Sequence, residues 1–184
     1  MPDLVRGPLP PGLDPEVVEA VAHHRRIDRA TDTHAATLRS VDRLRPTQGR
    51  FSGIVVDLFY DHFLACDWPR YCDQPLGGFI AGVYRDLEAY RPAMPPPVRP
   101  ICDRMAEQDW LSAYATVAGM ELTLRRVSRR LGRFIEPDQA VDDLTTRYAD
   151  LRRDFETLWR DLTPLAVPGS SALRPDPTPT ETTP

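Results

Sequence analysis

The sequence predicts an all-α fold, a single-domain helical bundle, on three observations. Apolar residues recur at three- and four-residue steps in several segments, which is the spacing of one face of an α-helix. No segment shows the sustained period-two alternation and hairpin turns that are typical of β-strands. The 20 prolines stand between five long tracts that contain none, as expected if prolines mark helix ends. These tracts are 16–45, 47–68, 76–91, 101–136 and 138–163.

Local signals within the tracts predict the individual helices. The first tract follows Asp14-Pro15-Glu16, where a capping side chain precedes proline at the first helical position. Two later tracts carry the apolar stripes of core-facing amphipathic helices. The first stripe is Leu76, Phe79, Ile80, Val83, Leu87 and Tyr90. The second stripe is Val141, Leu144, Tyr148, Leu151, Phe155, Leu158 and Leu162.

The chain length and its C-terminal composition predict the domain organisation. A chain of 184 residues suits one well-filled core better than two. We therefore expect one helical domain over residues 1–167. Residues 168–184 are rich in proline and threonine and carry too little apolar surface to offset the entropy of ordering, which predicts a disordered tail.

Composition excludes several classes of function. The formal net charge is −4, so the chain has no general attraction to nucleic acid or to an anionic membrane. Cys66, Cys72 and Cys102 lack the spacing of a zinc site, and no apolar run approaches the roughly 20 residues that cross a bilayer. We expect a reduced cytoplasmic protein with neither nucleic-acid nor membrane partners, whose oligomeric state the sequence leaves open.

The segment 54–64 is the most informative, because it is apolar except for Asp57, Asp61 and His62. On a helix, Asp57 and Asp61 lie four residues apart and share one face, with His62 one step round. Two adjacent carboxylates in an apolar helix repel each other and lose hydration. A divalent metal, an arginine from another helix, or a water-filled cleft would each resolve that cost.

A second polar group lies in the first tract. The face that begins with Val17 and Val21 continues with His24 and Asp28, and Asp32 extends it by another turn. A His/Asp pair at this spacing can present nitrogen and oxygen ligands to one cation, which the residues of 54–64 could complete. Such a mixed set suits Mn, Fe, Mg or Zn. The alternative is a structural network of these aspartates with Arg25, Arg26 and Arg29, and both interpretations stay open.

These residues resemble a known family, the bacterial acyl carrier protein phosphodiesterases, which are distantly related to the HD-type metal-dependent phosphohydrolases. The similarity lies in Asp3-Leu4-Val5-Arg6-Gly7, in His24-Arg25-Arg26-Ile27-Asp28 with Thr31-Asp32, and in Val56-Asp57 through Leu64 with Trp68. It extends to about Leu162. The resemblance implies an HD-domain-like helical bundle that hydrolyses the phosphodiester joining 4′-phosphopantetheine to a serine of holo acyl carrier protein. It also implies a divalent metal, typically manganese.

The resemblance further implies roles for individual residues. His24, Asp28, Asp61 and His62 would bind the metal or activate water, with Asp57 and Asp32 as further ligands. Asp28 and Asp61 would act in catalysis, and Arg25 and Arg26 would hold the phosphate. The acidic carrier protein would dock on the arginine-rich surface. Family members begin with an apolar helix that carries a histidine, so we expect this sequence to lack that first helix.

Two other functions remain alternatives. The first is an HD-like phosphohydrolase that acts on a nucleotide or another small phosphoester. The second is a non-catalytic helical interaction protein, whose His, Asp and Arg cluster forms only buried ion pairs.

Overall fold

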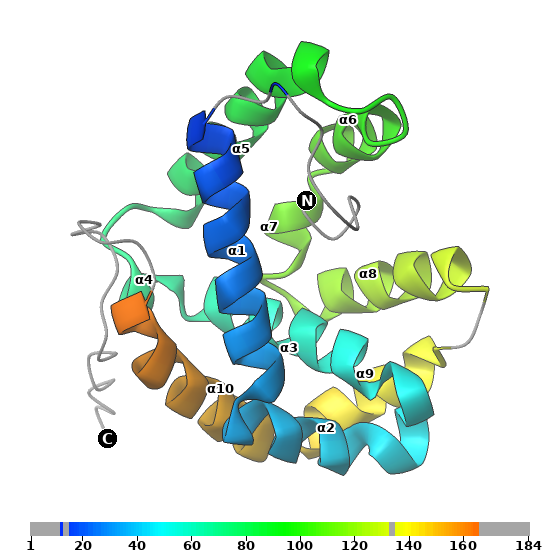
Figure 1. The fold of residues 1–184 in the computed structure, drawn as a ribbon. Helices are drawn as coiled ribbons and strands as arrows, with labels where there is room; N and C mark the ends of the chain where they lie inside the picture. The colour runs from blue at the N-terminus through cyan, green and yellow to red at the C-terminus, as the bar shows by residue number, and fades with distance from the viewer. Residues whose placement is uncertain (1–11, 13–14, 133–134, 166–184) are drawn as a thin grey trace.

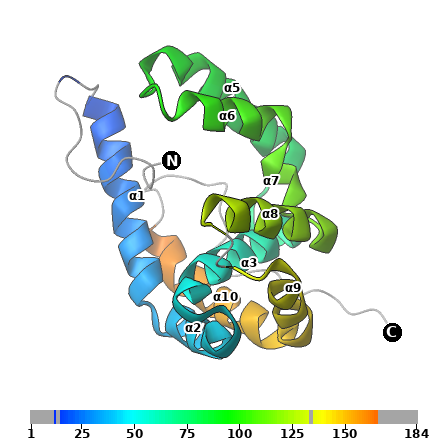
Figure 2. The same ribbon diagram turned by 90° about the vertical axis from the view of Figure 1, so that its right-hand side faces the viewer.

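The computed structural model describes residues 12, 15–132 and 135–165, and within these ranges every regular element is helical, which confirms the all-α prediction. Figures 1 and 2 show helices α5 and α6 at one end of the molecule and helices α2 and α9 at the other. No described helix is long and apolar enough to cross a membrane. The α-helices are α1 (Pro15–Thr33), α2 (Ala35–Gln48), α3 (Ser52–Cys66), α4 (Trp68–Tyr71), α5 (Leu76–Tyr90), α6 (Arg99–Glu107), α7 (Trp110–Ala113), α8 (Val117–Arg130), α9 (Pro137–Thr146) and α10 (Tyr148–Leu162).

Helix α3 forms the centre of the core. Its residues Val55, Val56, Phe59 and Phe63 are completely buried, and it packs against α2, α8 and α10. Phe63 also packs against the ring of Phe155 from α10, at a centroid distance of 6.0 Å. Because apolar residues occupy most sides of α3, the helix is enclosed by three neighbours rather than one.

The proline tracts predict the helical regions, but four of the five tracts contain breaks that have other causes. The tract 76–91 matches α5, and α1 begins at Pro15 as predicted, although Asp14 lies outside the described residues. Pro46 departs from the rule, since it lies in the last turn of α2. The predicted tail at 168–184 also lies outside the described residues.

His34 divides the first tract into α1 and α2. Its backbone is extended, and its ring Nδ1 accepts the backbone N–H of Ala36 at 3.2 Å, so the side chain caps α2. Its Nε2 then carries the proton and donates to a carboxylate oxygen of Asp161 at 3.1 Å. The histidine therefore ends one helix, starts the next and ties both to the end of α10.

A left-handed residue and a capping threonine divide the tract 101–136. Asp109 has a φ of 45° and ends the turn after α6, and the Thr116 hydroxyl accepts the N–H of Gly119 to cap α8. Gly119 is required because a Cβ there would lie 1.9 Å from the carbonyl oxygen of Ala113. The turn between α7 and α8 is therefore pressed against the first turn of α8.

Helix α1 is held much more loosely than α3. None of its residues is buried, and it packs against α2 and α10. Figure 2 shows it standing along one side of the molecule, in line with neither α2 nor α3. By contrast, α2 and α10 are joined by the buried Asp154, which accepts hydrogen bonds from Arg39, Ser40 and Arg43.

Candidate functional site

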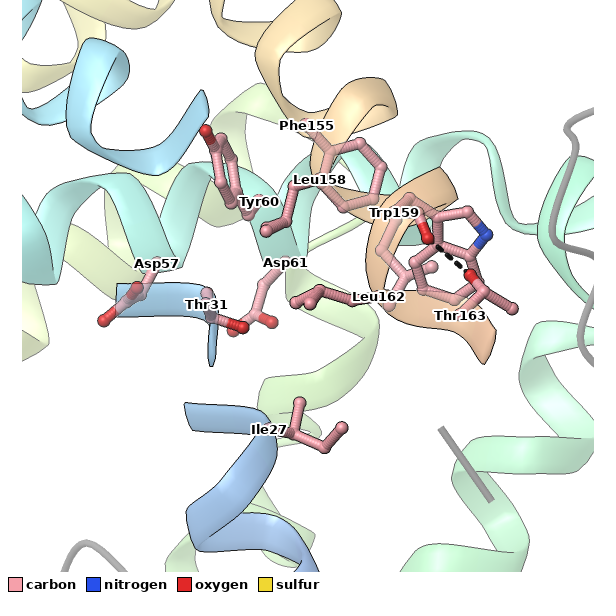
Figure 3. A pocket seen from close by; sticks show the side chains of 11 residues that line it. Ile27, Thr31, Asp57, Tyr60, Asp61, Phe155, Leu158, Trp159, Leu162 and Thr163 are labelled. Atoms are coloured by element: carbon pink, nitrogen blue, oxygen red, sulfur yellow. Dashed lines mark hydrogen bonds between the residues drawn. The ribbon is translucent and has the colours of Figure 1, made fainter. Parts of the chain in front are cut away.

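A pocket of about 290 Å³ opens between α1, α3 and α10. Its wall is apolar apart from two carboxylates, a tyrosine and two threonines (Figure 3). The figure shows Asp57 and Asp61 projecting from the same side of α3, toward Thr31 of α1. The lining residues are Ile27, Thr31, Asp57, Tyr60, Asp61, Leu64, Phe155, Leu158, Trp159, Leu162 and Thr163.

Asp57 and Asp61 face the pocket because the rest of α3 faces the core. The buried residues Val55, Phe59 and Phe63 take up the other sides of the helix, which leaves the i, i+4 aspartate pair for the open side. Both aspartates keep contact with solvent. A metal, an arginine or a water-filled cleft could accommodate these two charges, and the structure shows the two aspartates at a water-accessible cleft.

The carboxyl group of Asp61 is strongly perturbed. Protein atoms enclose it on the sides that do not open to solvent, and this burial, together with the charge on Asp57, raises its pKa from 3.8 to about 7. No cation among the described residues counters these two effects. Asp61 can therefore exchange a proton near neutral pH, as a general base or acid must.

The predicted residues of α1 lie beside the same pocket. His24 and Asp28 share the face of α1 that carries Ile27 and Thr31, because all four recur at three- and four-residue steps. His24 Nε2 lies 3.0 Å from Asp28 Oδ2. Nε2 is covered by protein atoms, and despite this contact it forms no hydrogen bond within the described part of the chain. Asp32 is exposed, one step round the helix from Thr31.

The predicted phosphate ligands Arg25 and Arg26 also lie on α1. Arg25 is half-buried, whereas Arg26 is exposed and its guanidinium donates to Nδ1 of His23 at 3.1 Å. Among the described residues, three arginine–carboxylate networks lie elsewhere, and none of them contains a predicted site residue. They are Asp154 with Arg39 and Arg43, Asp67 and Glu156 with Arg70 and Arg152, and Arg125 with Glu121 and Asp138.

The structure separates His62 from the carboxylates that precede it. Its ring is almost completely buried, and Nδ1–H donates to the backbone carbonyl of Tyr114 at 2.8 Å. The ring also packs edge-on against Tyr148, and burial lowers its pKa, which favours the neutral form. His62 thus joins α3 to the turn before α8 and does not line the pocket, whereas sequence spacing alone had placed it near Asp61.

The metal prediction is neither confirmed nor excluded by this arrangement. Within residues 15–132 and 135–165, no three His, Cys, Asp or Glu side chains come together in a group that could hold a metal ion. The pairs Asp57–Asp61 and His24–Asp28 have the ligand chemistry that a divalent cation requires, but they remain separate pairs. The ligand set of His24, Asp28, Asp32, Asp57, Asp61 and His62 stays a prediction.

Tyr114 and Arg126 were not among the predicted site residues, and Tyr114 interacts electrostatically with Asp61 and with Arg126. Burial raises the pKa of the Tyr114 hydroxyl and the charge on Asp61 raises it further, while the charge on Arg126 lowers it. Tyr114 therefore lies within electrostatic reach of both residues. Sequence spacing contains no signal for this, because Tyr114 is in a turn and Arg126 is one of several arginines in the last turns of α8.

Comparison with known proteins agrees with the motif resemblance. The family model described as acyl carrier protein phosphodiesterase matches residues 1–162. An acyl carrier protein phosphodiesterase of Klebsiella pneumoniae subsp. pneumoniae is 29% identical over 161 residues, which cover 87% of this chain and 82% of the relative. The protein of that name from Photorhabdus laumondii is 28% identical over 151 residues, covering 82% of this chain and 76% of the relative.

A third relative, from Salmonella dublin and with the same name, is 29% identical over 154 residues, covering 83% of this chain and 80% of the relative. No solved structure matches the chain, so the predicted likeness to HD domains stays a prediction. The family model spans all the helices described here, including both pairs of polar residues at the pocket. The chain belongs to the acyl carrier protein phosphodiesterase family.

Proposed function

We propose that this chain hydrolyses the phosphodiester between 4′-phosphopantetheine and a serine of holo acyl carrier protein, which would make it a hydrolase. Family membership over residues 1–162 is the observation that carries the proposal. The pocket supports it, since an apolar wall beside two carboxylates can contact the gem-dimethyl and methylene groups of an arm whose phosphate reacts next to it.

In this reaction, water supplies the hydroxyl that joins phosphorus and the proton that joins the departing serine oxygen. The phosphorus–oxygen bond to serine breaks, which gives apo carrier protein and free 4′-phosphopantetheine. In the metal-free site Asp61 is suited to accept the proton from water and return it to the serine oxygen, because its pKa of about 7 there lies near neutral pH. Asp28, on the facing side of α1, is the second proposed acid or base.

We further propose a divalent metal at the pocket, with manganese first and magnesium, iron or zinc as alternatives. Asp57 and Asp61 would hold it, with the His24–Asp28 pair as further donors and Asp32 and His62 as the remaining predicted ligands. The repulsion that raises the pKa of Asp61 supports this, because a cation between two carboxylates would remove it. When bound, the metal would offset charge on the phosphoryl oxygens and acidify water.

We propose that the carrier protein is the macromolecular partner and that the activity is cytoplasmic. Carrier proteins of this kind are acidic, and the exposed Arg129 and Arg130 at the end of α8 provide a complementary charge. Within the described residues no disulfide joins Cys66, Cys72 or Cys102, which suits a reducing compartment. Arg25 and Arg26 stay the proposed phosphate ligands on α1.

The test is the intact mass of holo carrier protein after incubation with the purified chain and Mn²⁺. We expect loss of the phosphopantetheine mass, and we expect Asp61→Asn to slow that loss at least about a hundredfold, within the range that a general base contributes. Asp142→Asn is the matched control, because Asp142 is exposed and its bonds to Thr145 and Thr146 use its backbone carbonyl.

An unchanged carrier mass would contradict the proposal if the Klebsiella pneumoniae relative is active in the same assay. Turnover of nucleotides or other small phosphoesters by a chain that ignores holo carrier protein would favour the small-molecule phosphohydrolase instead. Absence of both activities, with a melting temperature that neither Mn²⁺ nor chelator changes, would favour an interaction protein.

A further inference from the structure

Arg126 of α8 has a buried nitrogen with nothing to bind. Its Nη1 is inaccessible to solvent and has no hydrogen-bond partner in the part of the chain that the structure describes. A guanidinium has five N–H donors and accepts no hydrogen bonds, so a covered nitrogen without an acceptor loses hydration without compensation. Such a donor indicates an acceptor that is supplied from outside the described protein.

The orientation of this guanidinium is fixed by an aromatic ring. Its central carbon lies 5.4 Å from the centroid of the Trp110 ring, in the range of a cation–π contact. The indole N–H of Trp110 donates to Gln108 Oε1 at 3.0 Å, which holds the ring in place. A guanidinium held by one face still has its edge N–H groups available for two parallel bonds to an oxyanion.

Arg126 and Asp61 both act on the same tyrosine. The charge on Asp61 raises the pKa of the Tyr114 hydroxyl and the charge on Arg126 lowers it. The backbone of Tyr114 is fixed to α3 by the hydrogen bond from His62, and α8 packs directly on α3. An anion bound to Arg126 would therefore lie on the α8 side of α3, within electrostatic reach of Tyr114.

The neighbouring Arg125 has a different environment. It donates to Glu121 Oε1 at 2.8 Å and to Asp138 Oδ1 at 2.5 Å, so its charge is paired within the protein. Arg129 and Arg130, which follow in the same arginine-rich segment, are exposed to solvent. Arg126 thus differs from these neighbours in having a covered N–H that points to a missing acceptor.

We propose that Arg126 binds the phosphate of the substrate through its edge N–H groups and places the phosphorus against the Asp61 side of the site, with the Tyr114 hydroxyl as a second donor. The inference rests on the proposed function, because it assigns the phosphate-binding group of that same reaction. Tyr114 suits the role of donor, since a tyrosine hydroxyl is protonated at neutral pH. Bidentate arginine–phosphate pairs are among the stronger hydrogen-bonded contacts in proteins.

The experiment compares wild-type chain with Arg126→Met, Arg126→Lys and Arg125→Met. Methionine keeps the apolar contact with Trp110 but removes the donors, and lysine keeps the charge without the planar fork. Binding of inorganic phosphate is measured by isothermal titration calorimetry at constant ionic strength. Release of phosphopantetheine from holo carrier protein is measured by intact mass, and each melting temperature reports whether the variant is folded.

We expect Arg126→Met to bind phosphate about ten- to a hundredfold more weakly, the loss typical of charge-assisted hydrogen bonds, with an unchanged melting temperature. Turnover by Arg126→Met should fall by at least the same factor. Arg126→Lys should have phosphate affinity and turnover between those of wild type and Arg126→Met, and Arg125→Met should match wild type in both. Free guanidinium ion added to Arg126→Met should restore part of the turnover, which a purely structural role of Arg126 would not allow.

The inference and the proposed function fail in different ways. Equal phosphate binding by wild type and Arg126→Met overturns the inference, as does a wild-type chain that binds no phosphate. If wild type cleaves holo carrier protein and Arg126→Met does so equally well, the inference fails and the proposed function stands. If phosphate binding depends on Arg126 but holo carrier protein is not cleaved, the phosphate site stands and the proposed function fails.

Discussion

Replacing Asp57 by asparagine tests directly whether Asp61 lies in the perturbed environment that the structure shows. The substitution keeps the shape of the side chain and removes its charge. Burial is the larger cause of the raised pKa of Asp61 and the charge on Asp57 is the smaller. Removing the charge on Asp57 should therefore lower the pKa of Asp61 from about 7, and the larger effect of burial should keep it above 3.8.

The assay is a carboxyl ¹³C NMR titration of metal-free protein, with the Asp61 resonance assigned from its absence in Asp61→Asn. Wild-type Asp61 should titrate near pH 7, and Asp57→Asn should move its midpoint toward acid while leaving it well above 3.8. If a divalent cation binds both carboxylates, adding Mg²⁺ should lower the wild-type midpoint strongly and the midpoint of Asp57→Asn much less.

A wild-type midpoint near 4 would refute the reasoning, because it would mean that solvent access through the pocket mouth outweighs the enclosure of the carboxyl group. An unchanged midpoint in Asp57→Asn would be equally damaging, since it would show that the two aspartates are too far apart to interact. Asp142→Asn is the control, and it should leave the Asp61 midpoint where it is.

Three further predictions concern stability. The folded state holds the Asp61 proton up to about pH 7 and the unfolded state only to about pH 4, so ionisation of Asp61 disfavours folding. Asp61→Asn should therefore raise the melting temperature more at pH 8 than at pH 4. An equal change at both pH values would contradict this prediction. Gly119→Ala should lower the free energy of unfolding, measured with urea, by about 1–3 kcal/mol, because its Cβ would lie 1.9 Å from the Ala113 carbonyl oxygen. Gly77→Ala adds a Cβ in open space and should leave the free energy of unfolding unchanged. Asp154→Ala should lower the free energy of unfolding by about 1–3 kcal/mol in the same measurement, because it removes the buried acceptor that joins α2 to α10. A loss below about 0.5 kcal/mol, within the usual range for surface changes, would show that the network contributes little to stability.

Much of the fold can be predicted from local chemistry. Helix α5 runs from Leu76 to Tyr90 because Pro75 precedes it and Pro92 follows it, with an apolar stripe between them. Helix α9 likewise begins at Pro137, where a missing N–H costs nothing. The breaks at His34 and Asp109 are harder to predict, because a capping histidine and a left-handed aspartate have weak sequence signals.

The candidate site also has a part that the sequence predicts and a part that it does not. The spacing of Asp57 and Asp61 predicts a carboxylate pair on one face of a helix, and the structure places both at the pocket. The same spacing puts His62 one residue from Asp61 but about 100° round the helix, away from the face that the pair shares. Tertiary packing decides what lies at that angle, and here it is the carbonyl of Tyr114 rather than the pocket.

The sequence by itself determined the helical class, the family and the aspartate pair, because periodicity, proline positions and short motifs depend on residues that are close along the chain. Only the tertiary structure decided which groups surround that pair. Partial burial beside the pocket between α1, α3 and α10 raises the pKa of Asp61, and the orphaned donor of Arg126 lies on α8, which packs on α3. Sixty-five residues separate Asp61 from Arg126, and no local pattern carries information across that distance.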